Sequence, residues 1–144
     1  MGPSGEVHGI DAAPEMIALA RRKFERAGLN ADLQVGRVDE IPFPDGRFDA
    51  VLASFMIFHM DEDTRRRGLL EIHRVLKPGG ILAIVDFEPP AKGFLRSLAH
   101  LLGGDAMLRH SIHELRPLME EAGLAAVDTG ETRYRVIGFA RGIR

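Results

Sequence analysis

The chain has 144 residues, of which 45% are hydrophobic and 28% charged, values ordinary for one globular domain with a sizeable core. Its formal net charge of −2 gives no general attraction to nucleic acid, and no apolar run approaches the roughly 20 residues of a membrane span. Cysteine is absent, which excludes disulfides and thiolate metal sites and fits a reducing compartment. We therefore expect a cytoplasmic single domain over residues 1–144, with no nucleic-acid partner and no stable membrane insertion.

The pattern of apolar residues predicts strands and helices that alternate along the chain. Pro14 suits the first turn of a helix, Gly28 the left-handed position after that helix, and Ser111 with Glu114 a capping box. Alternation up to a final strand pair predicts an α/β fold, with a mostly parallel sheet, helices on both faces and one antiparallel C-terminal strand. The predicted strands are residues 7–10, 33–35, 48–53, 81–86, 124–128 and 134–140, and the predicted helices are 14–27, 61–76, 93–108 and 111–122.

Four short blocks follow one another in a characteristic order. They are residues 7–11 (VHGID), 41–45 (IPFPD), 48–51 (FDAV) and 76–80 (LKPGG). Together they resemble the class I S-adenosylmethionine-dependent methyltransferases, in particular the small-molecule group with an LPFPD and LKPGG pattern. The resemblance runs from about Gly5 to the C-terminus. It implies a Rossmann-like fold that binds S-adenosylmethionine and transfers a methyl group to a small molecule.

In that family, a strand, a glycine-rich loop and a helix precede the first block, and these 144 residues contain no such loop. The resemblance implies that this strand lies at the centre of the sheet. We therefore expect a truncated or partial gene product, in which the flanking strands close up or a second copy supplies the pairing, as in a homodimer. The alternative function is a non-catalytic methyltransferase-like remnant or partner subunit that binds no cofactor.

The end of the first predicted strand carries the first candidate site. An acid at the carboxyl end of a parallel strand can accept hydrogen bonds from both hydroxyl groups of a ribose. The resemblance implies that Asp11 binds the ribose of S-adenosylmethionine, that Met16 packs against the adenine, and that Ala12 belongs to the same cofactor site. In the alternative interpretation, Asp11 caps the following helix and Met16 is a core residue.

Residues 36–43 resemble the loop that lines the adenine edge in this family, where an acid usually follows the glycine. This chain has Arg37 at that position, and an arginine only donates hydrogen bonds. Asp39 or Glu40 is the expected substitute through a shifted loop, and the backbone N–H of Val38 the expected donor to the adenine ring nitrogen. Alternatively, residues 41–43 simply form an apolar plug under the loop.

The third strand leads into the expected methyl-transfer pocket. By resemblance, Ser54 and Phe55 border this pocket, and His59 matches a histidine that is common in the family's loop. A histidine has an unperturbed pKa near 6.5, so His59 is a candidate general base. The alternative is a surface histidine ahead of an acidic helix start, because alignment and desolvation can drive methyl transfer without a base. We expect no metal site.

Two further segments carry predictions of their own. The apolar segment at residues 88–108 lies where the family places its variable substrate cover, so an apolar or amphipathic substrate such as a quinone precursor, a fatty acyl derivative or a lipid is expected. Packing of this segment against the sheet or a second subunit explains its composition equally well. The arginines at 65–67 are expected to be a solvated helix start.

Overall fold

The computed structural model describes residues 5–88, 111–134 and 136–144. The chain forms two compact units, Met1–Pro42 and Phe43–Arg144. The predicted helix at residues 93–108, and the predicted substrate cover from residue 89 onward, lie outside the described residues. The expectation of a single domain over residues 1–144 stays a prediction.

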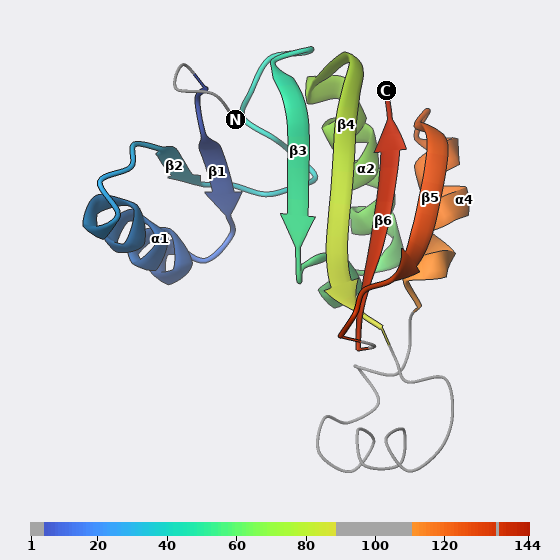
Figure 1. Cartoon of the computed structure of the whole chain (residues 1–144). Coiled ribbons are helices and arrows are strands. Elements are labelled where there is room, and N and C mark those ends of the chain that lie inside the picture. Colours follow the sequence, from blue (N-terminus) through green and yellow to red (C-terminus); the bar gives the residue numbers. More distant parts are fainter. Residues whose placement is uncertain (1–4, 89–110, 135) are drawn as a thin grey trace. The chain divides into compact units, whose positions relative to one another are not determined.

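The first unit is a strand–helix–strand motif (Figure 1). Strands β1 (His8–Asp11) and β2 (Asp32–Val35) pair in parallel, and helix α1 (Pro14–Arg26) connects them. Proline begins this helix as predicted, because its missing N–H would have no partner in the first turn. Gly28 follows the helix with a φ of 65°, which is the left-handed conformation that the sequence predicts. Burial of Ile17 and Leu33 forms the small core of this unit.

The second unit contains a four-stranded sheet in the order β3-β4-β6-β5 (Figure 1). Strands β3 (Phe48–Ser54) and β4 (Leu76–Phe87) are parallel, whereas β6 (Ile137–Ile143) runs antiparallel to both of its neighbours, β4 and β5 (Ala125–Glu131). Strand β6 is therefore the one antiparallel member of this sheet. This arrangement confirms the predicted α/β class with a mostly parallel sheet and an antiparallel C-terminal strand.

Two helices, α2 (Glu62–Val75) and α4 (Leu115–Glu121), pack beside each other on this sheet. Short 3-10 turns precede them at Ile57–His59 and Ile112–Glu114. Asp61 caps α2 by accepting the backbone N–H of Thr64 at 2.8 Å, and this bond lowers the pKa of the Asp61 carboxyl. Apolar side chains from these helices and strands form the core of the unit. The buried core residues include Leu69, Ile72, Leu82, Ile84, Leu115 and Met119.

The start of β4 differs from the prediction. The strand begins at Leu76, directly after α2 ends at Val75, whereas the sequence predicts a strand start at residue 81. The register passes from Phe48 opposite Leu76 to Ala50 opposite Ile81, so an irregularity absorbs the residues between them. Within it, a Cβ on Gly80 would lie 2.8 Å from the backbone oxygen of Lys77, so this position has no room for a side chain. The LKPGG block thus forms the start of β4, where the backbone is packed too closely for a side chain at Gly80.

The last two strands lie further along the chain than predicted. Strand β6 ends at Ile143 rather than residue 140, because it pairs with β4 from Phe87 opposite Ile137 to Ile81 opposite Ile143. Tyr134 lies in the turn before this strand, although its apolar character places it in the predicted strand. Cross-strand pairing sets these limits, and a single strand's sequence does not contain that information.

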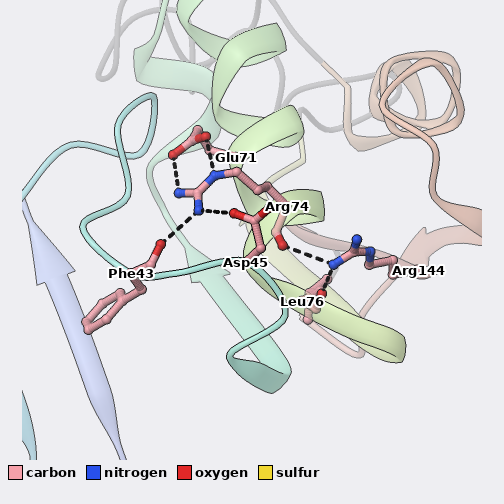
Figure 2. A network of polar contacts seen from close by, with 6 residues as sticks. All are labelled: Phe43, Asp45, Glu71, Arg74, Leu76 and Arg144. Atoms are coloured by element: carbon pink, nitrogen blue, oxygen red, sulfur yellow. Dashed lines mark hydrogen bonds and ion pairs between the residues drawn. The ribbon is translucent and has the colours of Figure 1, made fainter.

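Arg74 joins several segments at the amino ends of β3 and β4 (Figure 2). Its Nε and Nη2 donate to the carboxylate of Glu71 at 2.7 and 2.8 Å, while Nη1 donates to Asp45 and to the backbone oxygen of Phe43, both at 2.8 Å. The two carboxylates raise the pKa of Arg74. The Arg144 side chain donates to the backbone oxygens of Arg74 and Leu76. This network therefore fixes the end of α2 against the entry to both strands.

Candidate functional site

Asp11 lies exposed at the carboxyl end of β1, the edge at which open α/β sheets bind ligands. Its Oδ1 accepts the backbone N–H of Ala13 at 2.8 Å, which closes the turn between β1 and α1. Within the described residues, Oδ2 has no hydrogen-bond partner. The N-cap residue of α1 is Ala13 and has no side-chain cap, so Asp11 shapes the approach to the helix rather than capping it. One carboxylate oxygen remains available to accept from a ligand hydroxyl.

Met16 and Ala12 are both exposed near this strand end. The Met16 side chain is 51% exposed in the first turns of α1, while its neighbour Ile17 is 5% exposed and forms the core contact. Met16 is therefore not a core residue of this unit. An exposed, flexible thioether fits packing against a planar ring, although contact with an adenine stays a prediction.

Arg37 binds Asp39 through a two-point contact. The Nε and Nη2 atoms of Arg37 donate to the two carboxylate oxygens of Asp39, each at 2.9 Å. The Asp39 side chain is only 10% exposed, while that of Arg37 is 63% exposed. Such a bidentate pair is among the stronger side-chain contacts, so a ligand amino group would compete with Arg37 for this carboxylate.

The loop containing Arg37 also has an apolar component. Ile41 is 8% exposed, as the apolar-plug interpretation predicts, and Val38 is partly buried. Pro42 is exposed and Phe43 is half-buried, so within residues 41–43 the plug interpretation holds for Ile41 alone. The roles of Val38 and Asp39 at an adenine edge stay predictions.

Ser54 and Phe55 lie at the carboxyl end of β3. Phe55 has a φ of 52°, a left-handed conformation that costs a bulky residue about 1–2 kcal/mol. Its N–H still donates to the backbone oxygen of Val85 at 2.9 Å, so the ladder between β3 and β4 continues through it. The Phe55 ring is 42% exposed and lies 5.0 Å, between centroids, from the ring of Phe87. The pair forms an aromatic surface at this strand end.

His59 is the last residue of the 3-10 turn after β3, and its side chain is exposed. Its backbone N–H donates to the oxygen of Met56 at 3.3 Å. Within the described part of the chain, the imidazole makes no hydrogen bond or ion pair that would orient it. No group in residues 5–88, 111–134 and 136–144 orients His59 as a base, and its catalytic role stays a prediction.

Three buried charged residues were not among the predicted site residues. They are Arg65, Asp86 and Glu88, which are 5%, 1% and 8% exposed. The prediction of a solvated arginine run is wrong for Arg65, because this residue shares the buried face of α2 with Leu69 and Ile72. The helical spacing of Arg65 with Leu69 and Ile72 could have indicated its burial from the sequence. For Asp86, the corresponding signal was an acid at the end of an apolar strand.

The two buried carboxylates among them, Asp86 and Glu88, each bind a different segment of the chain. The Oδ2 atom of Asp86 accepts the backbone N–H of Ile57 at 3.0 Å. Glu88 accepts the hydroxyl of Ser111 and the backbone N–H of Ile112, both at 2.7 Å. The expected capping box is thus altered, because the Ser111 hydroxyl donates to Glu88 while it accepts from the N–H of His113.

In residues 5–88, 111–134 and 136–144, no cluster of three or more histidine, aspartate or glutamate side chains could hold a metal ion. Over the same ranges, no helix has the length and apolar character needed to cross a bilayer.

Sequence comparison identifies the relatives of this chain. The profile of a family described as "Methyltransferase domain" matches residues 1–80. A demethylmenaquinone methyltransferase of Thermus thermophilus is 44% identical over 91 residues, which is 63% of this chain and 40% of that protein. The ubiquinone/menaquinone biosynthesis C-methyltransferase UbiE of a Geobacter species is 42% identical over 99 residues, covering 67% of this chain and 41% of its own length. The chain thus spans about two fifths of these relatives.

Structural comparison supports the same fold. A SAM-dependent methyltransferase from Aquifex aeolicus superposes with a TM-score of 0.75 over 99% of this chain and 70% of its own, at 24% identity. One from Methanosarcina mazei gives a TM-score of 0.75 over 96% of this chain and 82% of its own, also at 24% identity. The fold is therefore a Rossmann-like α/β fold. With the profile match over residues 1–80, the chain belongs to the class I S-adenosylmethionine-dependent methyltransferase family.

Proposed function

We propose that this chain belongs to an enzyme that transfers the methyl group of S-adenosylmethionine to a small apolar molecule of the quinone-precursor class. The observation that carries this proposal is the 44% identity over 91 residues to a demethylmenaquinone methyltransferase. The match covers 40% of that relative, so the activity of the whole protein belongs to the proposal.

The available acceptor oxygen of Asp11 fits a ribose hydroxyl, and exposed Met16 fits the face of a planar base. Bound S-adenosylmethionine supplies an electrophilic methyl group. In this proposal, Ser54 and Phe55 border the transfer site, and the exposed Phe55, whose ring packs against half-buried Phe87, excludes water from it. His59 would accept a proton from the methyl acceptor only if substrate binding orients its imidazole.

The expected homodimer and cytoplasmic location also belong to this proposal. Strand β3 is an edge of its sheet, and its Leu52 side chain is 72% exposed. An exposed apolar edge strand favours pairing with a second copy. Sedimentation measurements over a range of concentrations test the dimer, and a single species with the monomer mass at every concentration would exclude it.

Calorimetric titration with S-adenosylhomocysteine, the demethylated cofactor, tests the cofactor assignment directly. Binding in the micromolar range supports a methyltransferase. An absence of heat at millimolar ligand would contradict the proposal and favour a remnant that binds no cofactor. A product assay with S-adenosylmethionine and a demethylated naphthoquinone then tests the substrate class.

A further inference from the structure

The turn after β3 carries two predicted site residues, and its conformation is unusual. Phe55 enters the turn with a φ of 52°, although it has no glycine-like freedom. A bulky residue remains in this region only when surrounding contacts hold it there. The contacts that fix this turn therefore determine where the Phe55 ring and the His59 side chain lie.

The buried carboxylate of Asp86 contacts two segments, the turn after β3 and the end of β4. Asp86 is 1% exposed, its Oδ1 accepts the N–H of Phe87 at 2.8 Å, and its Oδ2 accepts the N–H of Ile57 at 3.0 Å. Oδ2 also lies 3.5 Å from the nitrogen of Phe58. The same side chain thus binds the turn that follows Phe55 and the residue whose ring contacts Phe55.

A buried cation holds the far end of the same turn. Arg65 is 5% exposed, donates to the backbone oxygen of Met60 at 3.2 Å, and has its Cζ 5.6 Å from the ring centroid of Phe58. Among the residues that the structure describes, its buried Nε finds no hydrogen-bond partner. The turn is therefore held by a carboxylate that accepts from its N–H groups and a guanidinium that binds its carbonyl and its ring.

We propose that Asp86 is a positioning residue that fixes the turn after β3 and thereby sets the positions of Phe55 and His59. The turn's place at the methyl-transfer site rests on the proposed function, whereas the role of Asp86 in holding the turn does not. Charge-assisted bonds from a buried carboxylate stabilise such a turn more than neutral bonds do. Removing the charge should release the turn without disturbing the rest of the sheet.

Amide hydrogen exchange, measured by NMR on the whole chain, tests this role. Asp86→Asn should lower the protection of the Ile57 amide about tenfold to hundredfold, while the Ile112 amide is unchanged. The matched control is Glu88→Gln, which alters a second buried carboxylate, one that binds Ile112 instead. That variant should lower protection at Ile112 and leave Ile57 unchanged. Equal losses at both amides in both variants, or no loss at Ile57 in Asp86→Asn, would overturn the proposal.

Two further measurements keep the test independent of variant stability and of the proposed function. In the unsubstituted chain, the Ile57 amide should exchange as slowly as amides inside β4, and exchange at the rate of an exposed turn would overturn the proposal. In a second arm, Asp86→Asn should weaken S-adenosylhomocysteine binding about tenfold more than Glu88→Gln does. If the unsubstituted chain takes up no ligand, the proposed function fails, while the exchange results still decide the role of Asp86.

Discussion

The guanidinium of Arg37 occupies both carboxylate oxygens of Asp39 at 2.9 Å. The family pattern implies an acid at position 37. This chain instead has an arginine there, which binds Asp39. The contact explains how an arginine is accommodated in this loop. It also means that Asp39 can accept from an adenine amino group only by sharing its oxygens with Arg37.

We predict that Arg37→Gln strengthens S-adenosylhomocysteine binding about threefold to tenfold in calorimetric titration, because it removes the bidentate guanidinium that competes for the Asp39 carboxylate. The double variant Arg37→Gln with Asp39→Asn should lose this gain. Equal affinities of the single and double variants would show that Asp39 does not contact the ligand.

Asp11 should contribute directly to cofactor affinity. Asp11→Asn keeps an oxygen that can accept from the N–H of Ala13, but it removes the charge that strengthens a bond to a ribose hydroxyl. We expect S-adenosylhomocysteine binding to weaken about tenfold to hundredfold. Glu15→Gln, which alters an exposed acid in the first turn of α1, is the control and should bind as the unsubstituted chain does. A loss of the same size in the control would point to general electrostatics instead.

Arg74 should contribute to the stability of the second unit. Arg74→Lys replaces a planar fork by a single point charge, which cannot bind Glu71, Asp45 and the oxygen of Phe43 together. We expect a loss of about 1–2 kcal/mol in urea unfolding. Arg66→Lys alters an exposed arginine that pairs with Glu62 and Glu121, and should leave the urea midpoint almost unchanged. Equal shifts in the two variants would contradict a special role for Arg74.

His73 should make the stability depend on pH in the mildly acidic range. Partial burial, and then the charge of Arg144, lower the pKa of His73 below its ordinary 6.5. The unfolded chain therefore binds a proton more readily than the folded chain, so stability is full above pH 6.5 and falls as the pH drops through the folded pKa.

Urea unfolding of the unsubstituted chain and His73→Gln at pH 7.5 and pH 5 checks this linkage. The variant should lose less stability between the two pH values than the unsubstituted chain does. An identical loss in both proteins would assign the pH dependence to other groups.

The sequence alone determined the α/β class, the alternation of strands and helices, and the family. These follow from local signals such as Pro14 at a helix start, Asp61 ahead of an amphipathic helix, and the LKPGG block. It also placed Asp11, Ser54 and Phe55 at strand ends, because a strand's carboxyl end can be found from its apolar run.

Only the tertiary structure decided which polar groups meet. The pairing of Arg37 with Asp39, the burial of Arg65, and the contact of Asp86 with Ile57 depend on loop conformation or on residues 29 positions apart. The register of β6 against β4 likewise moved the last strand to Ile143. Local periodicity shows which face of an element is apolar, but a hydrogen bond between distant segments is specified by packing and strand register together.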